Sequence, residues 1–433
     1  MEGFDMIVPE RLASWARIES GDTAPGATCW GKAIRIKFPI DAKKLEKSIQ
    51  KLIDDFDIYR TVFKEIDGNF YAKTLTSLDF KLTVITPKGK TKEDKMKFVI
   101  EDCQKRIDSK FSIDESCSQF VLYKLGLMDN VIFIAMTHLI TDGYSLSLTF
   151  YNVLSYYMQN KPMYDMNDQG SFKDYMAEEI EYLNSSTWEK DIPYWEEVLS
   201  GYVPKKVNPH GILKYEKEKS GDYIDVSKKN IPQVAEKYKT SVFNLLLTAF
   251  HLAICSLNGT SDSLIKYADS NRSRKYKYTL GFLALLIPNR ARIDRNMHIS
   301  ELISNLSAQS QKDYIHRKAG SYFYGNTDYI LSYLPNRVEA RYDKSSFENT
   351  ASAIDLQLLD FKCGRDMGSI FAIVVNDMPD KFIMEFIGSS KIYGIDYMDK
   401  FKQEYIRIIQ QIGSGEDMLI SDLLELEDEI EEI

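Results

Sequence analysis

The sequence of 433 residues lacks any apolar run of the roughly twenty residues that a transmembrane helix needs. Its first residues, MEGFDMIVPERL, have no cationic region before an apolar one, so they do not resemble a secretory signal. From these absences we expect a cytoplasmic protein with no membrane contact.

Paired cysteines and clustered histidines are also missing. The five cysteines are odd in number and widely spread, and no C-x-x-C pair occurs, which argues against a disulfide framework and a zinc ribbon. No two of the five histidines have H-x-x-x-H spacing. The sequence therefore predicts no metal site.

An excess of positive charge is absent as well. Lysine and arginine number 55 against 64 aspartate and glutamate, giving a net charge of -9. Without an overall positive field to attract phosphates, nucleic-acid binding is not expected. No Walker loop, no G-x-S-x-G elbow and no G-x-G-x-x-G after a strand is found.

What is present indicates a chain of two folding units, because 433 residues exceed a single typical core. Both halves alternate amphipathic helices with short, mainly antiparallel strand patterns, which is typical of an α/β fold. Among local signals, Asp41 is an expected helix N-cap, Asp67-Gly68 an expected hairpin turn, and His251, inside an apolar segment, an expected core residue. We predict an N-terminal lobe over 1–180, a connecting helix and linker over 181–215, and a C-terminal lobe over 216–433.

The most informative stretch is VIFIAMTHLITDGYS, from Val131 to Ser145. Its apolar start predicts a buried strand, and the residues from Ser145 predict a helix. His138 therefore follows a strand end, where an imidazole is either catalytic or part of a hydrogen-bonded core. From these residues alone the two readings stand about even.

This stretch resembles the H-H-x-x-x-D-G motif of nonribosomal peptide synthetase condensation domains, within the chloramphenicol-acetyltransferase-like superfamily. Thr137 replaces the first histidine, whereas His138, Asp142 and Gly143 match the motif. Further segments resemble family elements in the family's order: Val8 to Ile18, Tyr59 to Phe63, Phe172 to Tyr175, Tyr194 to Gly201, Thr240 to Gly259, and Leu280-Gly281-Phe282 ending in Arg290.

The resemblance implies two chloramphenicol-acetyltransferase-like lobes in a V, with an active-site tunnel at their interface. It implies that His138 is catalytic and that the Gly143 amide approaches the reacting carbonyl, although a plain helix-start turn explains the glycine equally well. Asp142 is expected to be structural, paired with Arg290 as first choice or Arg272 as second. The remaining tunnel candidates are Thr137, Arg60, Ser332 and Asn336.

By the same resemblance, the expected function is acyl transfer from a phosphopantetheine thioester on an acyl or peptidyl carrier protein to an amine, in nonribosomal peptide, antibiotic or related natural-product biosynthesis. One alternative is O-acyl transfer to an alcohol, with coenzyme A or a carrier as donor. Another is a non-catalytic module that binds carriers. A free-standing, monomeric domain with no bound cofactor is expected.

Overall fold

The computed structural model describes residues 3–4, 6–20, 29–204, 219–323, 327–335, 356–359, 370–389 and 393–425. They form two compact units. Unit 1 takes the described residues of 1–185, 270–284 and 340–366, and unit 2 takes those of 186–269, 285–339 and 367–433.

The division differs from the predicted one, because the chain returns to unit 1 after it has entered unit 2. Residues 270–284 lie between two strands of unit 2, yet Tyr276, Leu280, Phe282 and Leu283 are buried in a core of unit 1. Strand β12 (Leu356–Leu359) also joins unit 1, by antiparallel pairing with β2 (Cys29–Ile36). Burial of these apolar side chains sets the boundary, which position along the chain does not reveal.

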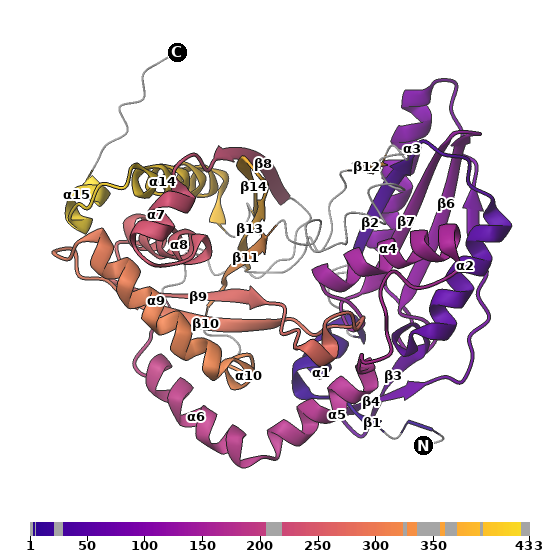
Figure 1. Cartoon of the computed structure of the whole chain (residues 1–433), viewed down its shortest axis with the longest axis horizontal. Helices are drawn as coiled ribbons and strands as arrows, with labels where there is room; N and C mark the ends of the chain where they lie inside the picture. The colour runs from indigo at the N-terminus through magenta and orange to yellow at the C-terminus, as the bar shows by residue number, and fades with distance from the viewer. Residues whose placement is uncertain are drawn as a thin grey trace. The chain divides into compact units, whose positions relative to one another are not determined.

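Unit 1 is built on a five-stranded sheet in the order β12-β2-β7-β6-β5. Its core helices lie on opposite faces of this sheet: α3 packs against one face, and α2 and α4 against the other (Figure 1). The described elements besides β2 and β12 are β1 (Met6–Ile7), α1 (Glu10–Ser20), α2 (Ala42–Asp55), η1 (Asp57–Arg60), β3 (Thr61–Ile66), β4 (Asn69–Thr74), β5 (Thr83–Ile85), α3 (Lys92–Ile107), β6 (Ser118–Gly126), β7 (Asp129–Thr137), α4 (Gly143–Gln159), α5 (Phe172–Leu183) and η2 (Arg274–Tyr276).

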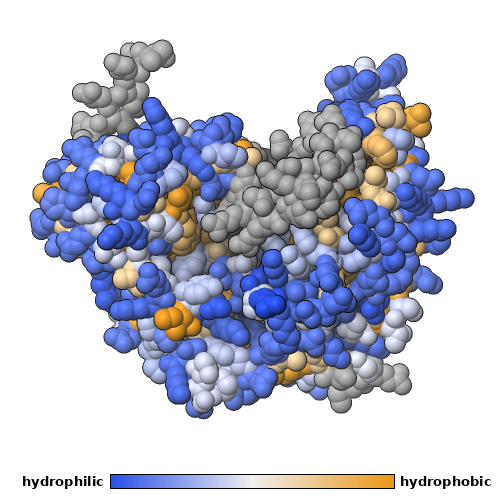
Figure 2. Space-filling view, viewed as in Figure 1, coloured by the Kyte–Doolittle hydropathy of each residue, from blue (hydrophilic) through white to orange (hydrophobic). Residues whose placement is uncertain are grey.

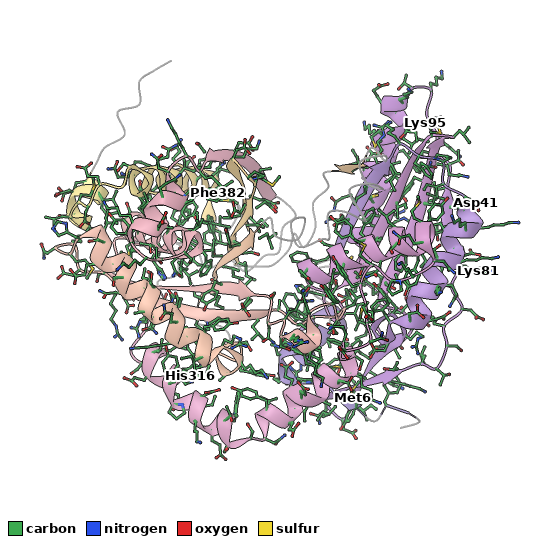
Figure 3. The ribbon with its side chains drawn as sticks, in the orientation of Figure 1. Met6, Asp41, Lys81, Lys95, His316 and Phe382 are labelled. Atoms are coloured by element: carbon green, nitrogen blue, oxygen red, sulfur yellow. The ribbon has the colours of Figure 1, made fainter. Side chains whose placement is uncertain are left out.

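Local sequence signals account for several of these elements. The predicted N-cap Asp41 accepts a hydrogen bond from the Lys44 amide at the start of α2 (Figure 3), which satisfies one of the helix's free donors. Asp67 and Gly68 have φ angles of 51° and 80° in the hairpin between β3 and β4. Both angles suit the tight turn that the Asp-Gly pair predicts.

Unit 2 contains a six-stranded sheet in the order β10-β9-β11-β13-β14-β8. Helices α8 and α14 lie side by side against it (Figure 1), and with α9 they enclose the largest core, which includes Phe382 (Figure 3). Its described elements are α6 (Ser186–Leu199), β8 (Lys219–Ser227), α7 (Ile231–Lys237), α8 (Val242–Asn258), β9 (Asp262–Asp269), β10 (Leu285–Arg292), α9 (Ile299–Ile315), α10 (Arg317–Gly320), β11 (Tyr329–Pro335), β13 (Phe371–Asp377), β14 (Lys381–Ser389), α14 (Ile395–Ser414) and α15 (Ile420–Glu425).

The visible surface of both units is mainly hydrophilic, with scattered hydrophobic residues (Figure 2). In the part of the chain that the structure describes, no single helix has the length and apolarity to cross a membrane. One pair of helices joined at a sharp bend, Ile231–Lys237 and Val242–Asn258, together has the length and apolar composition of a membrane span.

Close packing at Gly320 gives a stability prediction. A Cβ added there would lie 2.5 Å from Cζ2 of Trp195, whose indole is fully buried and donates to the His316 carbonyl oxygen at 2.8 Å. Gly320→Ala should therefore lower the free energy of unfolding by about 1–3 kcal/mol, although alanine normally favours a helix. Denaturant titration measures this change.

Gly126→Ala is the matched control, because the nearest atom to its added Cβ is 3.9 Å away. It should leave the unfolding midpoint unchanged. A Gly320→Ala protein as stable as the wild type would contradict the packing described for Trp195.

Candidate active site

His138 lies one residue beyond β7, at the point where the apolar strand ends. The strand pairs with β2 on one side and β6 on the other, which fixes its backbone. His138 as a whole residue is 8% exposed, so it is nearly buried. The turn after it ends at Asp142, the N-cap of α4, whose carboxylate accepts from the Ser145 amide at 2.8 Å.

Three aromatic rings of unit 1 surround the His138 imidazole. Its ring centroid is 4.5 Å from that of Trp15 on α1, 5.0 Å from that of Trp30 on β2, and 4.3 Å from that of Phe282. Trp30 is a register partner of Met136, so its side chain stands on the sheet face that α2 and α4 cover. These contacts hold the ring in place without supplying a charged partner.

This apolar setting keeps the imidazole neutral. Burial lowers the pKa of His138 to about 4, because a charged ring would lose its hydration. The carbonyl groups of His138 and Thr141 and the charge of Asp142 act in the opposite direction and offset only part of this effect. A neutral imidazole can accept a proton, which is what a general base requires.

Asp142 does not orient the imidazole, because its carboxylate is fully engaged elsewhere. Arg272 donates to both of its oxygens, at 2.9 and 3.1 Å, and the amides of Leu283 and Ala284 donate at 3.1 Å each. Burial raises the pKa of Asp142, but the Arg272 charge and these hydrogen bonds outweigh burial and lower it overall. The carboxylate thus ties the His138 turn to segment 270–284.

The predicted order of partners was wrong. Arg290, our first choice for Asp142, forms a two-point ion pair with Asp262 instead and donates to the carbonyl oxygens of Val198 and Ser200. It lies on β10 of unit 2, in register with Leu264 of β9. Arg272 pairs with Asp142 because residues 270–284 fold back into unit 1, which spacing along the chain could not show.

Ser145 extends the link between α4 and segment 270–284. Its hydroxyl donates to the Gly281 carbonyl oxygen at 2.7 Å and accepts from the Gly281 amide at 3.0 Å. Gly281 has a φ of 152°, and a Cβ there would lie 2.1 Å from the Phe172 ring. Glycine is therefore required at this point on both conformational and steric grounds.

Arg11 is a buried cation beside the site that the sequence did not single out. It forms a two-point ion pair with Glu179 on α5, at 2.8 Å to each oxygen, and donates to the Ala284 carbonyl oxygen at 3.0 Å. Its guanidinium carbon lies 4.8 Å from the centre of the Phe282 ring. Arg11 thus holds one of the aromatic rings that pack on His138.

Gly143 is the first residue of α4, and neither its backbone angles nor its contacts with the described residues demand glycine there. Its φ is not positive, and an added Cβ would meet no atom within 4 Å. Gly143 thus occupies the first turn of α4. The open space at its Cα would also admit a carbonyl group close to the backbone.

The remaining tunnel candidates are Arg60, Thr137, Ser332 and Asn336. Arg60 was wrongly assigned to substrate, because its guanidinium donates to carbonyl oxygens where α2 and β4 end, those of Ile53, Asp54, Leu75 and Thr76. Thr137 is fully buried and pairs in register with Cys29, on the opposite sheet face from Trp30. Ser332 lies half-buried on β11 of unit 2, and Asn336 lies outside the described residues.

The other described histidines have structural surroundings. His251, predicted as a core residue, is fully buried and contacts Ser263 Oγ at 2.6 Å and Asn289 Oδ1 at 3.0 Å. This serine–histidine–asparagine chain is closed to substrate because all three side chains are buried. His316 (Figure 3) contacts Asp191 at 2.7 Å and stacks on Tyr194. Within the described residues, no three His, Cys, Asp or Glu side chains form a group that could hold a metal ion.

Sequence reasoning missed the aromatic surroundings of His138. Trp15 lies within the family-like opening segment, and Trp30 is the second residue of β2, the strand that pairs with β7, so both were close to recognised elements. With four tryptophans in the chain, two in neighbouring elements of one lobe were a usable signal. Their convergence on one histidine depends on the path of α1, which the pattern does not give.

Comparison with known proteins identifies the family. The family description "Condensation domain" matches residues 30–323, more than half of the chain. The chain therefore belongs to the condensation-domain family.

Individual relatives are distant and much longer. Tyrocidine synthase 3 of Brevibacillus parabrevis is 18% identical over 88% of the chain, and surfactin synthase subunit 1 of Bacillus subtilis (strain 168) is 25% identical over 53%. The chain covers 6% and 7% of these two proteins. The chain therefore spans less than a tenth of the length of either relative.

Solved structures show that the fold is shared. The condensation domain of the monacolin K polyketide synthase MokA matches with a TM-score of 0.79 at 15% identity, over 96% of this chain and 98% of that one. The X-domain from teicoplanin biosynthesis, solved in complex with OxyB, matches with 0.79 at 14% identity, over 98% and 96%. The α/β fold is therefore that of condensation-domain structures, which consist of two chloramphenicol-acetyltransferase-like lobes.

The ionisation state of His138 can be tested directly. Its imidazole should stay neutral at pH 7 and titrate near pH 4, because burial lowers its pKa to about 4. A histidine in the unfolded chain has a pKa of about 6.5, so on acidification the unfolded chain binds a proton at this residue before the folded protein does. The folded state therefore loses stability as pH falls from about 6.5 to about 4. Histidine Cε1–H NMR shifts measure the titration, and His138→Ala assigns the signal. A midpoint near 6.5 would exclude the buried neutral ring.

The Asp142–Arg272 pair should dominate the stability of unit 1. Asp142→Asn leaves the buried Arg272 guanidinium without its counter-charge and should cost about 3–5 kcal/mol in denaturant unfolding. Because its folded pKa is lowered, Asp142 contributes stability above the unfolded pKa and loses it as pH falls through the folded value.

Glu10→Gln is the matched control, because it breaks an exposed ion pair with Arg17 and should cost less than about 1 kcal/mol. Equal costs for Asp142→Asn and Glu10→Gln would refute the anchoring role of Asp142.

Proposed function

We propose that this chain transfers an acyl group from a phosphopantetheine thioester to an amine and so forms an amide. The amine nitrogen attacks the thioester carbonyl carbon, the carbon–sulfur bond breaks, and the thiol is released. The donor is carried by an acyl or peptidyl carrier protein, and the chain itself needs no bound cofactor.

His138 is the proposed general base. The observation that carries this role is a neutral, nearly buried imidazole whose Nδ1 makes no regular hydrogen bond among the described residues, beside an aspartate committed to other partners. The imidazole accepts the proton of the attacking amine and returns it to the leaving thiolate sulfur. Membership of the condensation-domain family supports the reaction class.

Gly143 has a supporting role in the proposal. Its backbone amide is at the N-terminus of α4, where free N–H groups favour a developing negative charge. The space at its Cα permits close approach of a carbonyl group. A side chain larger than alanine there would obstruct that approach.

A non-catalytic, carrier-binding module is the rival function. Two observations favour it: Thr137 stands at the first motif position, and the fold matches an X-domain solved in complex with OxyB. O-acyl transfer to an alcohol uses the same residues as amide formation, so substrates alone distinguish these two reactions.

The test is product formation from a panel of acyl-CoA and acylated carrier donors with amines and alcohols, followed by mass spectrometry. His138→Ala should reduce turnover by about 10²–10⁴-fold, as expected for loss of a general base. His298→Ala, which removes an exposed histidine of unit 2, should match the wild type. Equal product from wild type and His138→Ala would refute the role of His138, and no product from any pair would favour the carrier-binding module.

A further inference from the structure

Trp30 contributes an unpaired hydrogen-bond donor beside His138. Among the described residues, its Nε1–H is buried and has no hydrogen-bond partner. The indole meets the imidazole nearly edge-on, with the ring planes at 70°. Buried donors almost always find an acceptor in folded proteins, so an unpaired one next to a candidate base needs an explanation.

His138 itself does not supply that acceptor when it acts as a base. If Nε2 accepts a proton from the substrate, Nδ1 carries the ring hydrogen, because a neutral imidazole has one N–H and one acceptor nitrogen. Two N–H groups cannot pair with one another. The acceptor for Trp30 must therefore come from outside the described chain.

We infer that the indole N–H of Trp30 donates a hydrogen bond to the carbonyl oxygen of the acyl group that reacts beside His138. This inference rests on the proposed acyl transfer. When the amine attacks, the carbonyl π electrons move to that oxygen, and a fixed donor is most valuable where such charge develops. The double bond re-forms as the thiolate leaves, and Trp30 keeps its proton throughout.

Trp30→Phe tests the donor, because it retains an aromatic ring against His138 and removes only the N–H. It should lower kcat by about a hundredfold, as for loss of one oxyanion donor, with KM changed less than about twofold. Trp15→Phe is the matched control. Its ring also packs on His138, but Trp15 has no buried unpaired donor among the described residues, so this variant reports the effect of altered ring packing alone and should lower kcat much less than Trp30→Phe does.

A second measurement uses the intact wild-type protein and does not depend on how the variants fold. The indole ¹⁵N–¹H signal of Trp30, assigned by its loss in Trp30→Phe, is followed during titration with octanoyl-pantetheine whose thioester sulfur is replaced by nitrogen. This probe retains the carbonyl oxygen and does not react. The Trp30 signal should move downfield, and those of Trp188 and Trp195 should not.

The outcomes separate this inference from the proposed function. Turnover that requires His138 but is unchanged in Trp30→Phe overturns the role of Trp30 and leaves acyl transfer standing. Equal losses in Trp30→Phe and Trp15→Phe also overturn it, because ring packing would then be the cause. If the wild type transfers no acyl group, acyl transfer fails, and the NMR titration decides whether Trp30 contacts the carbonyl oxygen; an unmoved signal overturns the inference.

Discussion

The carboxylate of Asp142 is the interaction on which the candidate site depends. It caps α4 through the Ser145 amide, pairs with Arg272, and accepts from the amides of Leu283 and Ala284. These donors come from two parts of the chain more than a hundred residues apart. A buried carboxylate is stable only with such partners, so the charge forces segment 270–284 against the His138 turn.

The hydrogen bonds that already occupy the Asp142 carboxylate have a consequence for the pKa of His138. A carboxylate free to accept from the imidazole would stabilise its protonated form, as in a hydrolase triad. With its oxygens already bonded, Asp142 raises the pKa of His138 only through its charge, and burial among aromatic rings prevails. The same anchor places Phe282 against the imidazole, because Phe282 precedes the two amides that Asp142 holds. Asp142 thus anchors the turn that carries His138 and places one of the aromatic rings whose packing keeps the imidazole neutral.

Sequence patterns predicted what local physics controls. The strand before His138, the cap of α2 and the Asp67-Gly68 hairpin follow from apolar runs, short polar side chains and allowed backbone angles, and the structure has all three. The partner of Asp142 was misjudged because the sequence offers two arginines, Arg272 and Arg290, with nothing local to choose between them. Only Arg272 lies in segment 270–284, which returns to unit 1. That return is decided by burial of side chains between distant segments, which no local pattern encodes.

The aromatic surroundings of His138 also could not be predicted from local sequence patterns. Trp15, Trp30 and Phe282 come from a helix, a strand and a loop, and they meet because the ion pair of Arg11 with Glu179 fixes α1 against α5 and the Phe282 segment. The sequence motif singles out His138, to which we assign the proposed role of general base. The groups that surround its imidazole are distributed over the lobe. Thr137 shows this too, because it stands beside His138 in the motif, yet its register with Cys29 places it on the sheet face opposite Trp30.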